Sequence, residues 1–228
     1  MPRCNAPLRK ETLLSTLTAP TVAEQLDRLV SLGVPRLARL TGDEFRSLAT
    51  DLVPPAVESA LLVVHPSLVP ASRLAPLLDR GGRPGFVVED MTDLDEFVPV
   101  EPALVPDRPL YLIAEPERGD EMRNWSPEEA NTAILGRGRS PLTVSEGISW
   151  LLQRPELLEP NHCFMTIGSR KRRPRGGLDA RTPAIWISGG TGRDGRERSG
   201  APKVGWCWAR NRHTWLGFAS TAARAPLD

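Results

Sequence analysis

The sequence predicts an α+β protein, with N-terminal helices and a small α/β unit followed by a C-terminal antiparallel sheet. Two observations predict it. Four Ser/Thr-x-x-Glu patterns open amphipathic stretches, which is typical of helix N-termini. Seven short apolar runs bounded by Pro, Gly or charged residues are typical of buried strands, and the last four follow one another after residue 160.

Each predicted helix begins at a capping box, in which a Ser or Thr side chain accepts from a backbone N–H and a Glu reaches back. Gly33 ends the first helix and Pro54 the second. The third begins with Pro127, whose missing N–H is not needed at that position. It ends at Gly136, and the fourth ends before Pro155. The four boxes lie at 21–24, 41–44, 126–129 and 143–146.

Strands are predicted in two groups. An amphipathic stretch at 71–78 lies between the first two strands, so this order permits a βαβ unit. In the later group, the connection at 209–214 is short enough for a hairpin turn, whereas 168–182 and 189–203 are long, glycine-rich and charged. The predicted strands are 61–64, 85–88 and 110–113, then 163–167, 184–188, 204–208 and 215–218.

The chain of 228 residues is long enough for one domain or two. We divide it into a helical region at 1–58, an α/β region with two further helices at 59–159, an antiparallel region with basic glycine-rich loops at 160–219, and a frayed tail at 220–228. All four can also form one compact domain.

Composition indicates a soluble, cytoplasmic protein. A net charge of +1, 40% apolar and 25% charged residues are ordinary for globular proteins. No apolar run approaches the ~18 residues of a membrane span, and the N-terminus lacks the apolar core of a secretory signal. The three cysteines, Cys4, Cys163 and Cys207, are widely spaced and predict reduced thiols.

The positive charge is concentrated late in the chain, where 160–215 holds 12 basic and 3 acidic side chains interleaved with tryptophans. Arginines attract phosphates, and indoles stack on bases or guanidinium groups. We therefore predict a protein that holds an anionic partner, whether a phosphate-containing small molecule, a nucleotide or a nucleic acid; a merely solvated loop is the alternative. The predicted ligand-binding residues are Arg118, Asp120, Arg170, Lys171, Arg172, Arg173, Trp186, Lys203, Trp206, Trp208 and Asn211.

The glycine-rich stretch 188–200 follows a predicted strand, as phosphate-binding loops do, but it lacks the Gly-Lys-Ser/Thr ending of a Walker loop. Backbone amides of Gly189, Gly190 and Gly192 could form an anion nest. A flexible connection between two strands is the other interpretation.

A small enzyme of specialised metabolism acting on an anionic molecule is the second functional hypothesis, with His213 as its acid/base residue. No metal and no cofactor is predicted. His162 and Cys163 are adjacent and point to opposite faces of a strand, which disfavours zinc. Cys163 and Cys207 are better explained as core residues.

Several motifs in the second half of the chain are distinctive in combination. Together they resemble an actinobacterial family known only as a domain of unknown function. The resemblance implies an actinobacterial, intracellular source, and it brings no activity, cofactor or catalytic residue. The motifs are Arg118-Gly-Asp-Glu-Met, Gly136-Arg-Gly-Arg-Ser-Pro-Leu-Thr, Asn161-His-Cys-Phe-Met, Lys203-Val-Gly-Trp-Cys-Trp and Asn211-Arg-His-Thr-Trp-Leu-Gly.

Overall fold

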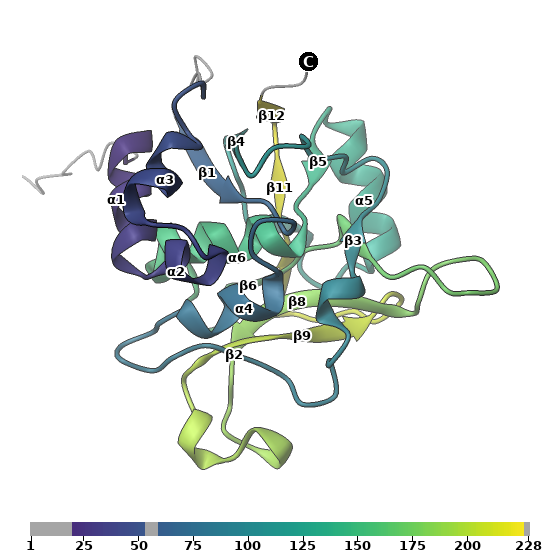
Figure 1. Ribbon diagram of the computed structural model, residues 1–228. Helices are drawn as coiled ribbons and strands as arrows, with labels where there is room; N and C mark the ends of the chain where they lie inside the picture. The colour runs from purple at the N-terminus through teal and green to yellow at the C-terminus, as the bar shows by residue number, and fades with distance from the viewer. Residues whose placement is uncertain (1–19, 53–58, 226–228) are drawn as a thin grey trace, which may run out of the picture.

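The computed structural model describes residues 20–52 and 59–225 (Figure 1). Within them, helices and strands are mixed, and antiparallel pairs are the most frequent, which confirms the predicted α+β class. The α-helices are α1 (Val22–Ser31), α2 (Val34–Ala38), α3 (Gly42–Ser47), α4 (Ala71–Leu74), α5 (Pro127–Gly136) and α6 (Val144–Gln153). The strands are β1 (Ala60–Val64), β2 (Phe86–Val87), β3 (Val98–Pro99), β4 (Leu110–Ala114), β5 (Ser140–Pro141), β6 (Cys163–Met165), β7 (Ser169–Arg170), β8 (Arg181–Ile187), β9 (Pro202–Trp208), β10 (Leu216–Phe218), β11 (Ser220–Thr221) and β12 (Ala223–Ala225).

All four predicted capping boxes are present, at the N-termini of α1, α3, α5 and α6. In each box the glutamate carboxylate accepts from the backbone N–H of the capping residue, at 2.7 to 2.8 Å. Helix α3 is shorter than predicted, because it ends at Ser47 and gives way to turns. The predicted stop at Pro54 lies outside the described residues.

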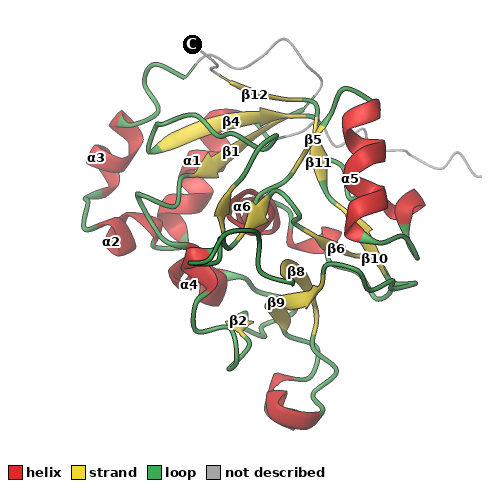
Figure 2. Cartoon of the chain, turned by 90° about the vertical axis from the view of Figure 1, so that its right-hand side faces the viewer, coloured by secondary structure: helices red, strands yellow, loops and turns green. Residues whose placement is uncertain are grey.

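Helix α6 forms the centre of the molecule, and each of its ten residues is buried. It lies between the sheet β1-β4-β12 and the five-stranded sheet β10-β6-β8-β9-β2, as the end-on view in Figure 2 shows. The Ser149 hydroxyl accepts from the Val64 N–H on one side. On the other side, Gly147 lies so close to the large sheet that a Cβ there would be 2.6 Å from Thr166. One helix therefore joins both sheets.

Two predicted strand pairings are wrong. The predicted βαβ unit does not form, because β1 pairs antiparallel with β4, whereas β2 pairs parallel with β9 in the other sheet. The hairpin at 209–214 does not form either. Strand β9 has β8 on one edge and β2 on the other, so β10 pairs with β6 instead, in parallel. The centre of the C-terminal sheet, β6-β8-β9, is antiparallel as predicted.

The predicted frayed tail is also wrong for residues 220–225. They form β11, which pairs with β5, and β12, which adds a third strand to the sheet of β1 and β4. The free edge of β4 supplies the hydrogen-bond partners, and the Arg224 guanidinium makes an ion pair with Glu146 of α6. Strands from different predicted regions therefore lie in the same sheet: β12 of the predicted tail pairs with β4, and β2 of the predicted α/β region pairs with β9. Within the described residues, no helix has the length and apolar character needed to cross a membrane.

Candidate functional site

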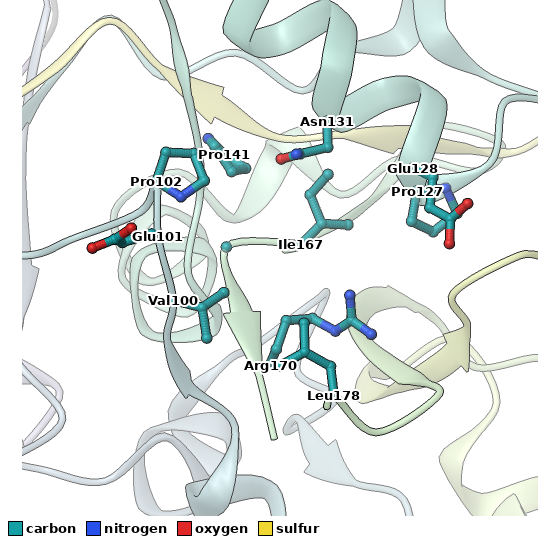
Figure 3. Close-up of a pocket in the computed structure, with 11 residues that line it drawn as sticks. Val100, Glu101, Pro102, Pro127, Glu128, Asn131, Pro141, Ile167, Arg170 and Leu178 are labelled. Atoms are coloured by element: carbon teal, nitrogen blue, oxygen red, sulfur yellow. The ribbon is translucent and has the colours of Figure 1, made fainter. Parts of the chain in front are cut away.

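A pocket lies where β7, the first turn of α5 and the segment 100–102 meet (Figure 3). It encloses about 500 Å³ including its open mouth. The Arg170 guanidinium and the Asn131 amide enter it from opposite sides, with Ile167 between them. Most of the remaining wall is apolar, and two carboxylates, of Glu101 and Glu128, also border it. The apolar lining residues are Val100, Pro102, Pro127, Pro141, Ile167 and Leu178.

Short backbone contacts fix the position of Arg170. Strand β7 pairs with β3, so that Arg170 lies opposite Val98. The neighbouring Ser169 is buried, and its hydroxyl accepts from the Val144 N–H at the start of α6. Gly168 packs against the strand before that helix, and a Cβ there would lie 2.6 Å from the Pro141 carbonyl oxygen. Arg170 therefore extends from the rigid centre of the protein into the pocket.

The Arg170 guanidinium lacks part of the hydrogen-bond partners and the counter-ion that a buried cation usually has. Its Nη2 donates to the Asp179 carbonyl oxygen at 2.7 Å, but its Nε is buried and has no hydrogen-bond partner. No ion pair to a carboxylate is found for it among the described residues. Burial lowers the pKa of Arg170 below its usual value, although Asp179 and Glu128 nearby oppose this shift. A partly desolvated guanidinium without a counter-ion is a ready site for an anion.

The two lysines among the predicted ligand-binding residues have acidic partners. Lys171 Nζ lies 2.7 Å from an Asp93 oxygen and 2.9 Å from a Glu96 oxygen. Lys203 Nζ lies 2.7 Å from an Asp194 oxygen and sits over the Trp186 ring, 4.9 Å from its centroid. These lysines are therefore compensated within the protein.

Two of the predicted tryptophans, Trp186 and Trp206, line a second hollow. Trp206 donates to Asp90 at 3.3 Å and contacts Trp208, with ring centroids 4.7 Å apart. Trp186 and Trp206 line this hollow together with Asp90, Asp194 and the side chain of Lys203. Its two cations, Lys203 and Arg193, already pair with Asp194 and Asp90, which makes it less favourable for an anion than the Arg170 pocket. The Gly190 N–H, a member of the predicted anion nest, donates to the Ser188 hydroxyl.

Arg118 and Asp120 come together with a residue that was not among the predicted site residues, His162. One Asp120 oxygen lies 2.8 Å from Arg118 Nη2 and 2.8 Å from His162 Nδ1. The other Asp120 oxygen is buried without a hydrogen-bond partner. Residues 120 and 162 are too far apart in sequence for any local pattern to predict their contact.

His213, the predicted acid/base residue, is half-buried beside Trp215, and its Nε2 has no hydrogen-bond partner. Burial lowers its pKa. In the described part of the chain no carboxylate forms a hydrogen bond with it, although a histidine base is commonly oriented by such a partner. His162 has such a partner. Asn211 is exposed, as are Arg172 and Arg173. An enzyme using His213 stays a prediction.

Both described cysteines are buried. Desolvation raises the pKa of Cys163, and it raises that of Cys207 to about 12, so both thiols stay protonated at neutral pH. The described residues contain no cluster of three or more His, Cys, Asp or Glu side chains that could hold a metal ion.

One family model matches residues 28–227, and its description is "Family of unknown function (DUF5701)". No curated protein and no solved structure matches the chain.

Proposed function

We propose that this chain, which belongs to the family of unknown function DUF5701, binds a small carboxylate-bearing molecule in the Arg170 pocket. A single observation carries the proposal: the guanidinium lines the pocket, and among the described residues its buried Nε has no hydrogen-bond partner and no ion pair compensates its charge. A bound carboxylate would supply the missing acceptor and counter-charge, and the planar guanidinium can bind its two oxygens at once.

The pocket walls narrow the class of ligand. Proline, valine, leucine and isoleucine side chains favour an apolar body attached to the anionic group. Glu101 and Glu128 at the border would repel a multiply charged phosphate more strongly than a singly charged carboxylate. The Asn131 amide offers a further hydrogen bond to a polar substituent. A cytoplasmic location and an actinobacterial source remain proposals from the sequence.

The test uses benzoate, which combines a flat apolar body with one carboxylate, and inorganic phosphate as the comparison. We expect saturable binding of benzoate in calorimetry or ligand-detected NMR, and weaker binding of phosphate. Arg170→Gln should weaken benzoate binding roughly tenfold to hundredfold, because hydrogen bonds to a charged group contribute about 1.5–3 kcal/mol.

Arg175→Gln is the matched control, since it removes the same charge from an exposed arginine outside the pocket lining. It should leave benzoate affinity unchanged. Equal losses in the two variants, or tighter binding of phosphate than of benzoate, would contradict the proposal. If Arg170→Lys still bound benzoate as the wild type does, the positive charge would matter more for affinity than bidentate hydrogen bonding by the guanidinium.

A further inference from the structure

The segment 171–179 forms a hairpin arm that projects from the body of the protein ahead of β8 (Figure 1). The Asp179 N–H donates to the Lys171 carbonyl oxygen at 2.8 Å, and the Arg173 N–H donates to that of Gly177 at 3.0 Å. Gly177 itself has a φ of 77°, which suits glycine at the turn. The arm is therefore held in one shape by its own backbone.

Ion pairs fix the base of the arm. Lys171 and Arg181 both contact the Asp93 carboxylate, at 2.7 and 2.6 Å, and Arg181 also contacts Asp179 at 3.1 Å. The guanidinium of Arg181 additionally lies 5.3 Å from the centre of the Phe97 ring. Because these cations are neutralised where they sit, they contribute little to the potential at the tip.

The tip of the arm carries a concentration of positive charge. Arg172, Arg173 and Arg175 are all exposed, and within the described residues none of them forms an ion pair. Lys203, by contrast, is neutralised by Asp194. Three free guanidinium groups on four consecutive residues produce a local positive potential that attracts polyanions.

An exposed indole lies at the base of the same arm. Trp208 is directly opposite Arg181 in the β8–β9 ladder, and the next residue, Ala209, donates to the Ala180 carbonyl oxygen at 2.7 Å. Trp208 is 48% exposed, while its contact with Trp206 orients the ring. Such a ring has free surface on which a flat group can stack.

We propose that the arm and Trp208 form a binding surface for single-stranded nucleic acid. The three arginines contact successive phosphates, and Trp208 stacks on an unpaired base. A duplex can satisfy the arginines but not the indole, because its bases are stacked on one another. Leu178 of the arm lines the Arg170 pocket, but the three tip arginines and Trp208 do not, so each proposal can fail without the other.

The experiment titrates the whole chain with a fluorescein-labelled oligothymidylate of about 15 nucleotides, followed by anisotropy at several salt concentrations. A plot of log affinity against log salt should have a slope of about −2, since each of three phosphate contacts contributes about −0.7 on a single strand. Arg172→Gln/Arg173→Gln/Arg175→Gln should remove this slope and most of the affinity. Trp208→Ala should weaken binding about tenfold, and Trp208→Phe should retain most of it.

The matched control is Arg36→Gln/Arg39→Gln/Arg196→Gln, which removes the same net charge from exposed arginines on other elements. It should bind as the wild type does. Thermal melts check that every variant is folded. Equal affinity for a duplex of the same length, equal affinity for polyglutamate, or equal losses in both triple variants would overturn the proposal.

Discussion

Two arginines lie near β5, and their surroundings differ. Arg224 is 5% exposed, and its Nε and Nη2 lie 2.6 and 2.8 Å from the two Glu146 oxygens. Its Nη2 also donates to Pro141. Arg170 borders a pocket that Pro141 lines as well, but among the described residues its side chain donates only to the Asp179 carbonyl oxygen.

The electrostatics of the two side chains diverge accordingly. Burial lowers the pKa of each arginine, but the charge and hydrogen bonds of Glu146 outweigh that effect at Arg224, whose pKa is raised. At Arg170 burial prevails, and the pKa is lowered. A buried arginine with a full set of partners holds the structure together. A buried arginine that lacks such partners has a guanidinium group that can still bind an anionic ligand.

The largest expected effect is at the compensated arginine. Arg224→Met should destabilise the protein by about 3–5 kcal/mol, because it leaves the Glu146 carboxylate buried without its counter-ion. Urea denaturation followed by circular dichroism measures this. The double variant Glu146→Gln/Arg224→Met should recover part of the loss, since glutamine can still accept from the Thr143 N–H. No recovery would mean that the pair acts mainly through packing.

Arg181 is an intermediate case, since it is paired but only partly covered. Hydrogen bonds from Arg181, with Lys171 helping, lower the pKa of Asp93 from about 4 to about 2. Because the folded pKa is depressed, this contribution is fully present above pH 4 and is lost as the pH falls through about 2. Asp93→Asn should therefore be about 1–2 kcal/mol less stable than the wild type at pH 7, and most of this difference should be lost by pH 2. A constant difference across this range would contradict the assignment.

The sequence predicted features that depend on residues close together in the chain, and it failed for those that depend on residues far apart. Capping boxes depend on residues three apart, so a reading of the sequence located α1 and α6 correctly. Strand pairing depends instead on whether each edge of a strand is already hydrogen-bonded to another strand. Nothing in residues 209–214 indicates that β2, more than 100 positions earlier, occupies the second edge of β9 and excludes β10.

The candidate site shows the same limit. Arg170 was one of several basic residues predicted to bind an anion, and the sequence had no means of ranking it above Lys171 or Lys203. The ranking depends on Asp93, 78 residues away from Lys171, and on the local loop that brings Asp194 to Lys203. Only the folded chain shows that carboxylates neutralise Lys171 and Lys203, whereas Arg170 has no ion pair among the described residues.

The smallest expected effect on stability is at Arg170. This side chain is partly buried, whereas that of Arg224 is almost completely buried. Arg170→Met removes one hydrogen bond to a carbonyl oxygen, but it also removes a buried Nε that has no partner, and the two effects oppose each other. The free energy of unfolding should thus stay within about 1 kcal/mol of the wild type, while benzoate binding is lost. The two measurements on one variant separate a binding role from a structural one. If Arg170→Met instead destabilised the protein as much as Arg224→Met, Arg170 would be a structural residue, and the difference between the two arginines would not indicate function.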